Sequence, residues 1–159
     1  TPVLLVGVDE LISRFHDLSR HRGLVPGGIS GNVESFEPQR LHAEAWEHAR
    51  EFVEADARRA AARYDEQKGT EYATARVGEV ARALAAGRVE SLLVAADRVL
   101  WGELDPDAGE VDLHDRRENG DVDVVDRLAV LGLQRGADVI ARRASRLPDG
   151  AAVAAVMRY

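Results

Sequence analysis

Two short stretches of the sequence carry residue types that could bind a small ligand. The first is the loop from Gly27 to Asn32, GGISGN, in which flexible glycines stand before a predicted helix and backbone N–H groups could hold a phosphate. The loop lacks the lysine and the hydroxyl residue of a phosphate loop, and it follows a predicted helix rather than a strand. Two interpretations therefore stay open: a ligand-binding loop that uses Gly27, Gly28, Gly31 and Asn32, or a plain connector.

The second stretch is Asp97-Arg98, which directly follows the predicted buried strand Ser91 to Ala96. Open α/β sheets place ligand groups at the carboxyl ends of their strands. The same two residues also fit an ordinary turn. We therefore treat Asp97 and Arg98 as candidates for ligand binding, with the turn as the alternative.

The aspartates Asp105, Asp107 and Asp112 have spacing similar to that of a calcium-binding loop. The similarity fails at the fifth position, which is Gly109 rather than an oxygen ligand, and at the sixth, which is Glu110 rather than glycine. Aspartates are common in turns because they hydrogen-bond their own backbone. We therefore predict a hairpin turn here.

No arrangement of residues predicts catalysis or a metal site. His42 and His48 are six residues apart, so they do not share the helix face that a zinc helix needs, and Glu44 with His48 gives only two side chains. No serine stands in a nucleophile elbow, no spaced carboxylate pair stands out, and there is no cysteine to act as a nucleophile or thiolate ligand. We therefore predict a protein that is not an enzyme, with no catalytic residue, no metal and no cofactor.

The charge of the chain argues against autonomous nucleic-acid binding. Its 28 acidic and 21 basic residues give a formal net charge of −7, and an acidic surface repels phosphate. One basic cluster stands near the end of the sequence, and we interpret it as ordinary surface arginines. Its members are Arg135, Arg142, Arg143, Arg146 and Arg158.

Three features of the sequence bear on where the protein acts. No apolar run approaches the roughly 20 residues that a membrane-spanning helix needs, and no signal peptide is visible. The absence of cysteine fits a reducing interior. We therefore expect a cytoplasmic protein with no membrane partner. Because the first residue is Thr1 rather than methionine, we also expect the sequence to be a piece of a longer protein.

The elements that must position these residues begin with a strand and two helices. The continuous apolar run Val3 to Val8 predicts a central strand covered on both faces. A short helix is predicted from Asp9 to about Ser19, because apolar residues recur at helical spacing and acids stand at its start. A second helix begins at Pro38 and ends before Gly69. A helix this long is expected to brace two domains or to pack along a sheet.

After Gly69 the pattern alternates between helices and strands. A helix with its stop at Gly87 and another with its stop at Gly136 are predicted. Strands are predicted at Ser91–Ala96, Val99–Leu104, Glu110–His114, Asp138–Arg143 and Ala151–Met157. This order predicts an α/β sandwich in which the last two strands pair through a short connection.

The order of several segments resembles the later half of the bacterial archaeo-eukaryotic release factor families. The segments are PVLLVGV at 2–8, GISGN at 28–32, LHAEAW at 41–46, GRVESLLVA at 87–95, Trp101-Gly102 with Asp105, and LPDGAAVAAVMRY at 147–159. The likeness covers nearly the whole chain in order and spacing. No single motif is strongly specific, and the series as a whole carries the resemblance.

The resemblance implies a domain organisation and no catalytic residue within this chain. Residues 1–36 would be the tail of a middle α/β domain, 37–68 a long connecting helix, and 69–159 a third domain with an α/β/α sandwich fold, similar to small archaeal ribosomal proteins that bind kink-turn RNA. Release factors carry a peptide-releasing Gly-Gly-Gln in the middle domain. This chain has Gly27-Gly28-Ile29 instead, too near the end of that domain, so no catalytic residue is carried over. The sequence upstream of Thr1 would show whether a Gly-Gly-Gln loop is present.

The third domain of release factors contacts a translational GTPase and the ribosome. The resemblance therefore implies a non-catalytic docking role in ribosome rescue, hibernation or stress, by analogy of fold. Two alternatives stay open. The chain could be a small-ligand or nucleotide-binding α/β domain that uses the Gly27 to Asn32 loop, or a structural domain that forms a homodimer through the long helix from Pro38.

Overall fold

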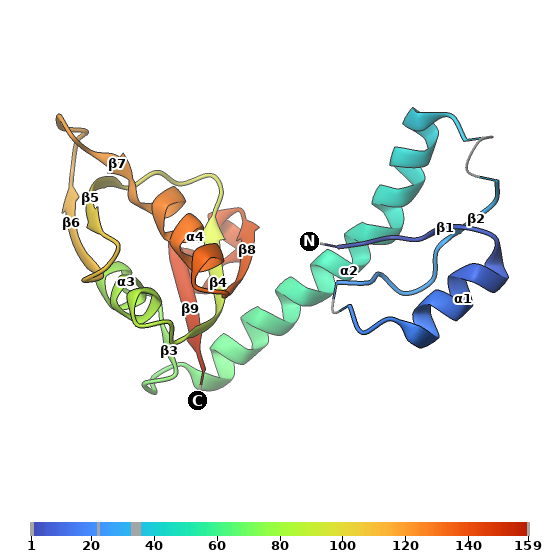
Figure 1. The fold of residues 1–159 in the computed structure, drawn as a ribbon. Coiled ribbons are helices and arrows are strands. Elements are labelled where there is room, and N and C mark those ends of the chain that lie inside the picture. Colours follow the sequence, from blue (N-terminus) through green and yellow to red (C-terminus); the bar gives the residue numbers. More distant parts are fainter. Residues whose placement is uncertain (1, 22, 33–35, 159) are drawn as a thin grey trace. The chain divides into compact units, whose positions relative to one another are not determined.

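The computed structural model describes residues 2–21, 23–32 and 36–158 of the chain. Contacts divide it into two compact units, the first ending at Asp56 and the second beginning at Ala57. The single helix α2, Pro38–Gln67, runs through this boundary (Figure 1). Both units combine helices and strands, which confirms the predicted α/β class.

The first unit is built on a strand-helix-strand segment. Strand β1 (Val6–Gly7) pairs in parallel with β2 (Ile29–Ser30), and helix α1 (Asp9–Leu18) provides the crossover that parallel pairing requires. Asp9 and Glu10 lie in the first turn of α1, where negative charge favours the helix dipole. The predicted helix is therefore confirmed, and β2 is a strand that the sequence did not indicate.

The prediction of a strand from Val3 to Val8 buried on both faces is wrong. Only Val6 and Gly7 form a regular strand, with one further bridge between Val3 and Leu24. The side chains of Val3 and Val8 are 39% and 54% exposed. An apolar run shows that both faces of a strand are apolar, but burial needs a layer on each face. Among the described residues, β1 has β2 as its only strand partner.

Helix α2 has the predicted start at Pro38 and the predicted stop, because Gly69 takes the left-handed conformation at φ 87°. Its last turns belong to the second unit. There Ala57, Ala60 and Tyr64 are buried, at the i, i+3 and i+7 spacing of one helix face. The long helix therefore supplies apolar surface to the core of the second unit.

The main sheet of the second unit has four strands, β3 (Ala73–Thr74), β9 (Val153–Met157), β4 (Val89–Ala95) and β8 (Asp138–Arg142), in that order. β8 is parallel to β4, whereas β9 is antiparallel to β4 and β3. The prediction that the last two strands pair with each other is wrong, because β4 lies between them. Their connection, residues 143–152, contains two short 3-10 turns with Ala144 and Leu147 buried, so it is long enough to cross β4.

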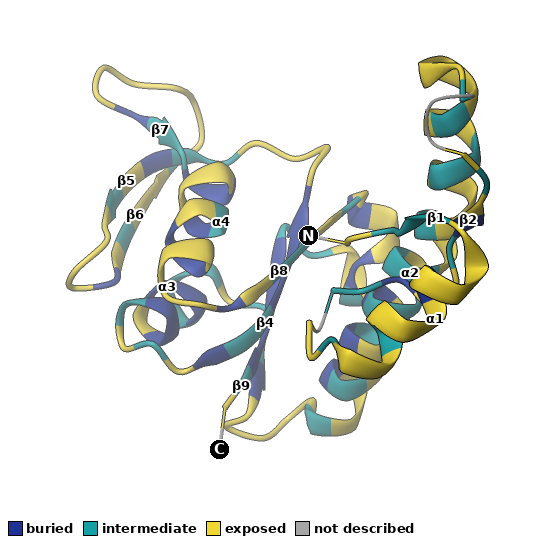
Figure 2. Ribbon diagram, turned by 45° about the vertical axis from the view of Figure 1, so that its right-hand side comes forward, coloured by how far each residue is buried: buried dark blue, intermediate teal, exposed yellow. Residues whose placement is uncertain are grey.

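Helices and turns cover both faces of this sheet. Alternate residues of β4 point to opposite faces, so Leu92 and Val94 join one core and Leu93 and Ala95 the other. The first core lies under α3 (Val77–Ala85) and α4 (Val124–Gln134), and the second under the end of α2 and the 143–152 connection. Figure 2 shows the burial concentrated on the central strands. The predicted α/β/α sandwich is confirmed.

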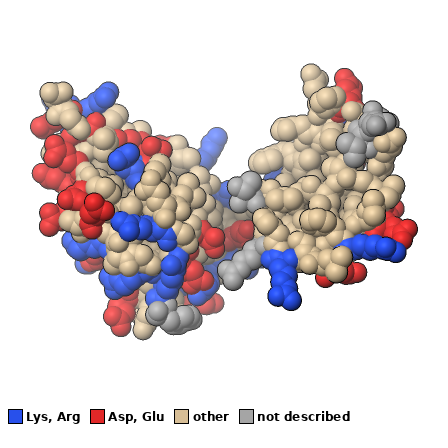
Figure 3. Space-filling model, viewed as in Figure 1, with Lys and Arg blue, Asp and Glu red and all other residues tan. Residues whose placement is uncertain are grey.

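A separate antiparallel sheet consists of β6 (Glu110–His114), β5 (Trp101–Asp105) and β7 (Val122–Asp123), in that order. In the turn between β5 and β6, Oδ1 of Asp105 accepts hydrogen bonds from the N–H groups of Asp107 and Ala108, at 2.9 and 3.0 Å. These two bonds lower the pKa of Asp105. The turn interpretation of these aspartates is confirmed, and acidic side chains gather over this hairpin (Figure 3).

Candidate functional site

The predicted ligand residues Asp97 and Arg98 follow the carboxyl end of β4, as expected. The N–H of Ala96 donates to the carbonyl oxygen of Arg142 at 2.7 Å, which extends the pairing of β4 with β8. Oδ1 of Asp97 accepts a hydrogen bond from the N–H of Ala144 at 2.7 Å. This bond caps the turn Ala144–Arg146, so the Asp97 carboxylate already has a structural partner.

Because β4 and β8 end side by side, their carboxyl edge gathers arginines. Ala95 is the register partner of Arg142, and Arg143 and Arg146 follow in the connection. Arg98, Arg143 and Arg146 are exposed, and their guanidinium groups make no hydrogen bond or ion pair within the described part of the chain. The edge is therefore a positively charged surface that could hold an anion, and whether it does so stays a prediction.

Replacing Asp97 by alanine is expected to lower the free energy of unfolding by about 1 to 2 kcal/mol, because the N–H of the buried Ala144 then has no acceptor. Urea denaturation measures the change. Asp138→Ala, a substitution of an exposed aspartate at the start of β8, is the control and should change the midpoint little. An unchanged denaturation midpoint for Asp97→Ala would contradict the capping role. The Asp97 carboxylate would then have no structural role and would be available to bind a ligand.

The glycine-rich loop lies in the first unit, so the two predicted ligand stretches belong to different units. Its glycines have structural reasons. Gly27 has φ 79°, and its carbonyl oxygen is 2.7 Å from Nε2 of His16. A Cβ on Gly28 would lie 2.9 Å from Cδ1 of Ile12, and one on Gly31 would lie 2.7 Å from the ring of Phe36. Asn32 is exposed. These contacts account for the glycines without a ligand, and the binding interpretation stays a prediction.

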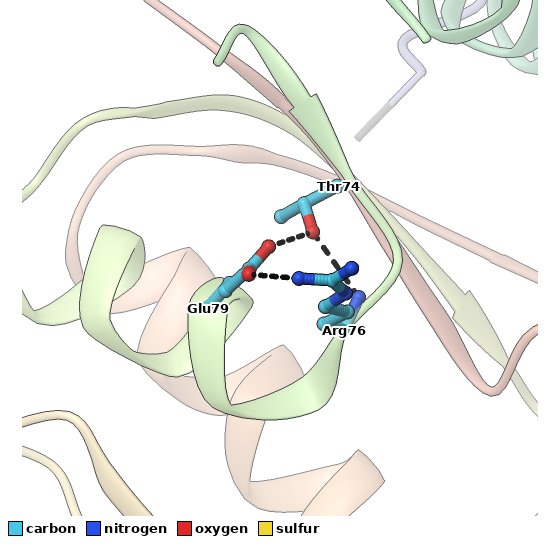
Figure 4. Close-up of polar contacts among 3 residues, drawn as sticks. All are labelled: Thr74, Arg76 and Glu79. Atoms are coloured by element: carbon cyan, nitrogen blue, oxygen red, sulfur yellow. Dashed lines mark hydrogen bonds and ion pairs between the residues drawn. The ribbon is translucent and has the colours of Figure 1, made fainter. Parts of the chain in front are cut away.

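A polar cluster that the sequence did not indicate fixes the start of α3. The hydroxyl of Thr74 donates to Oε2 of Glu79 at 2.5 Å and accepts the N–H of Arg76 at 3.2 Å, while Nη1 of Arg76 lies 2.9 Å from Oε1 of Glu79 (Figure 4). The hydrogen bond from Thr74, followed by that from Arg76, lowers the pKa of Glu79. Thr74 and Glu79 are five residues apart, so the cluster does not have the three-residue spacing of a capping box.

A second cluster, also missed in the sequence, anchors the charged loop after β6. Asp121 is buried, with its side chain 1% exposed, and it accepts the N–H of Glu118 and contacts Nδ1 of His114, both at 2.8 Å. The bond from Glu118 is the main cause of a lowered pKa for Asp121. Nearby, the guanidinium of Arg117 lies 4.7 Å from the ring centre of Trp101. These contacts hold the loop against the β5–β6 hairpin.

The pKa of His114 is raised, chiefly by the hydrogen bond with Asp121 and further by the charges of Asp121, Glu118 and Asp112. The charged imidazole therefore stabilises the fold fully below the pKa of the unfolded state, 6.5, and this stabilisation is lost as pH rises through the higher folded-state pKa. We expect His114→Asn to destabilise the chain most at acidic pH and less as pH rises. Urea midpoints across this range measure it, with His48→Asn in exposed helix as the control. If the difference in midpoint between His114→Asn and the unaltered chain did not depend on pH, the interaction between His114 and Asp121 would be contradicted.

Within residues 2–21, 23–32 and 36–158, no three His, Cys, Asp or Glu side chains are grouped so that they could hold a metal ion. In the same part of the chain, no helix has the length and apolar character to cross a membrane. Trp46, in α2, is 54% exposed.

Comparison with known proteins gives a match between the chain and one protein family. The model of the bacterial archaeo-eukaryotic release factor family 3 matches residues 1–88, more than half of the chain. No curated protein sequence matches it. The match with this family model confirms the predicted resemblance.

Solved structures give the fold comparison. The C-terminal domain of a peptide chain release factor from Methanosarcina mazei matches with a TM-score of 0.58 and 16% identity, covering 79% of this chain and 97% of that domain. Pelota from Archaeoglobus fulgidus (TM-score 0.47, 18% identity) and an archaeal translation termination factor (TM-score 0.44, 19% identity) each cover 99% of this chain. The chain spans 49% and 43% of their respective lengths. At such identities the first match establishes a shared fold.

Proposed function

We propose, because the chain belongs to the bacterial archaeo-eukaryotic release factor family 3, that its second unit docks on the ribosome or on a translational GTPase. The role would be exercised in ribosome rescue, hibernation or stress, and therefore in the cytoplasm. The observation that carries this proposal is the likeness of fold to the C-terminal domain of a release factor, which is covered over 97% of its length. The step from fold to docking is an analogy that the experiment below tests.

We further propose that this chain contributes no catalytic residue. Gly27-Gly28 is followed by Ile29, which is buried in β2, rather than by the glutamine of the family's releasing loop. Gly28 packs against Ile12 and the carbonyl oxygen of Leu5. These contacts support a structural reading of the two glycines and a docking role without chemistry for this part of the protein.

The domain assignment is also a proposal. Residues 1–36 are assigned to the tail of a middle α/β domain, 37–68 to a connecting helix, and 69–159 to the release-factor-like third domain. Because Ala57, Ala60 and Tyr64 contribute to the second unit, the end of the connecting helix is expected to be needed for the third domain to fold.

Sedimentation through a sucrose cushion with purified ribosomes tests the docking role. We expect the full chain, and a truncated chain of residues 57–159, to pellet with ribosomes from starved or growing cells. The truncation begins at Ala57 rather than at residue 70, because a later start would remove Ala60 and Tyr64 from the second core. The proposal would be refuted if both proteins remained in the supernatant with ribosomes from starved cells and also with ribosomes from growing cells.

A further inference from the structure

The C-terminal ends of α3 and α4 lie side by side and are joined by one arginine. Nη1 of Arg158 donates to the carbonyl oxygen of Gly87 at 3.2 Å, and Nη2 donates to that of Gly136 at 2.5 Å. The backbone N–H of Arg158 donates to the carbonyl oxygen of Arg88 at 2.7 Å. Gly87 and Gly136 directly follow the last turns, where the helix dipoles are negative, so the guanidinium is stabilised there. Arg158 is thus fixed in place yet remains exposed.

Three more arginines surround this point. Arg135 is the C-cap of α4, Arg88 follows Gly87, and Arg82 lies in the last turn of α3. All three are exposed. Figure 3 shows Lys and Arg side chains gathered over α3 and the adjoining end of α4. We name Arg82, Arg88, Arg135 and Arg158 the arginine cluster.

The arginine cluster is weakly compensated by acids. Nη2 of Arg135 lies 3.4 Å from Oδ1 of Asp107, whose side chain is 93% exposed, so this ion pair contributes little and can be exchanged. The side chains of Arg82 and Arg88 have no hydrogen bond or ion pair among the described residues. The charge of Arg82 also acts on Glu79 of the same helix. The cluster therefore presents exposed positive charge that is only partly compensated.

The same end of α4 also carries an exposed apolar side chain. Leu133, in the last turn of α4, is 65% exposed, and Val130, one turn earlier, is 37% exposed. The N–H of Gly136 donates to the carbonyl oxygen of Leu133 at 3.2 Å, and the carbonyl oxygen of Gly136 in turn accepts from Arg158. An exposed leucine at the same helix end as Arg135 and the carbonyl bound by Arg158 combines the apolar and charged groups of a protein interface.

We propose that the arginine cluster and Leu133 together bind an acidic protein segment. Carboxylates of the segment pair with the guanidinium groups, and an apolar side chain of the segment packs on Leu133. A nucleic acid would use only the charges and would gain nothing from the exposed leucine, and the net charge of −7 opposes a long polyanion. Carboxylates are also the natural partners of exposed arginines in protein interfaces. This proposal does not depend on ribosome docking, because it states the chemistry of the partner whether or not that partner belongs to the ribosome.

The test measures binding of the full chain to a short fluorescein-labelled peptide of glutamate and aspartate with one central leucine, by fluorescence anisotropy. The triple variant Arg82→Gln, Arg88→Gln, Arg135→Gln is expected to bind roughly tenfold more weakly, since three exposed charge pairs are lost. All three side chains are exposed and glutamine keeps the helix propensity of arginine at position 82, so the variant is expected to fold, which circular dichroism verifies. Arg158 is left intact because it holds the two helix ends together.

The control removes the same charge from the first unit, with the exposed Arg14→Gln, Arg20→Gln and Arg40→Gln, and should change affinity less than about twofold. Leu133→Ser should weaken binding of the peptide with the central leucine by about fivefold. It should leave unchanged the binding of a matched peptide in which serine replaces that leucine. Equal weakening by both triple variants, or no binding by the unaltered chain, overturns the proposal. Tighter binding of labelled oligouridylate than of the peptide, lost with the first triple variant, overturns it in favour of a nucleic-acid surface.

Discussion

Replacing Gly102 by alanine is expected to lower the free energy of unfolding of the second unit by about 4 kcal/mol, the sum of a steric and a backbone cost. Gly102 is buried in β5, the central strand between β6 and β7. A Cβ at this position would lie 2.0 Å from the carbonyl oxygen of Asp112 and 3.0 Å from Cα of Leu113. Its φ of 158° is also one that side chains rarely adopt. Because the obstacle is backbone of the paired strand, relief requires opening the hairpin.

Guanidinium denaturation followed by circular dichroism measures this loss. Gly150→Ala is the matched control: Gly150 has φ 65° and no atom near its missing Cβ, so only the conformational cost, about 1 kcal/mol, is expected. If the two substitutions lowered the free energy of unfolding equally, the pairing of Gly102 with Leu113 would be contradicted.

The second large effect is expected at Leu92, which is fully buried in β4 and belongs to the core under α3 and α4. Leu92→Ala should destabilise the second unit by about 2 to 5 kcal/mol, because the removed side chain leaves a cavity. That is a large part of the roughly 5 to 15 kcal/mol that stabilises a domain. Thermal denaturation of the variant should therefore show a much lower midpoint.

A neighbouring glycine makes this prediction sharper. A Cβ on Gly132 in α4 would lie 3.0 Å from Cδ2 of Leu92 and 3.0 Å from Cγ2 of Val139. In the unaltered chain the methyl group of Gly132→Ala has little room because of these close contacts. In the Leu92→Ala background the methyl group enters the space that Leu92 vacated, and alanine also has a higher helix propensity than glycine. The double variant is expected to recover about 1 kcal/mol relative to Leu92→Ala. Simple additivity of the two single effects would contradict the contact between α4 and β4.

Much of this fold could be predicted from local pattern. The helices α1 to α4 follow from apolar residues at helical spacing together with local stops, and Gly87 and Gly136 take the left-handed conformation expected of such stops. The turn at Asp105 follows from its side chain bonding its own backbone. Strand pairing could not be predicted in this way. Nothing local to β8 or β9 states that β4 lies between them, since sheet order depends on contacts between distant segments.

The surface of the protein shows the same limit more clearly. Sequence proximity groups Arg135 and Arg158 with the three arginines from Arg142 to Arg146, but β8 separates them. Residues before and after this strand lie at its opposite ends, so Arg135 joins Arg82 and Arg88, and Arg143 joins Arg98. The sequence of the loop from Gly27 to Asn32 left a ligand-binding loop and a plain connector both open, and structural contacts such as the Phe36 ring against Gly31 are visible only in three dimensions.

Saturable binding to ribosomes is the most direct test of the central proposal, that a member of this release factor family acts here by docking rather than by chemistry. The measurement is the fraction of labelled full chain that sediments with increasing concentrations of purified ribosomes, at several salt concentrations. The docking role predicts a stoichiometric plateau that weakens but persists as salt rises. A bound fraction that grows without saturation and disappears at moderate salt, or no bound fraction at all, would contradict it.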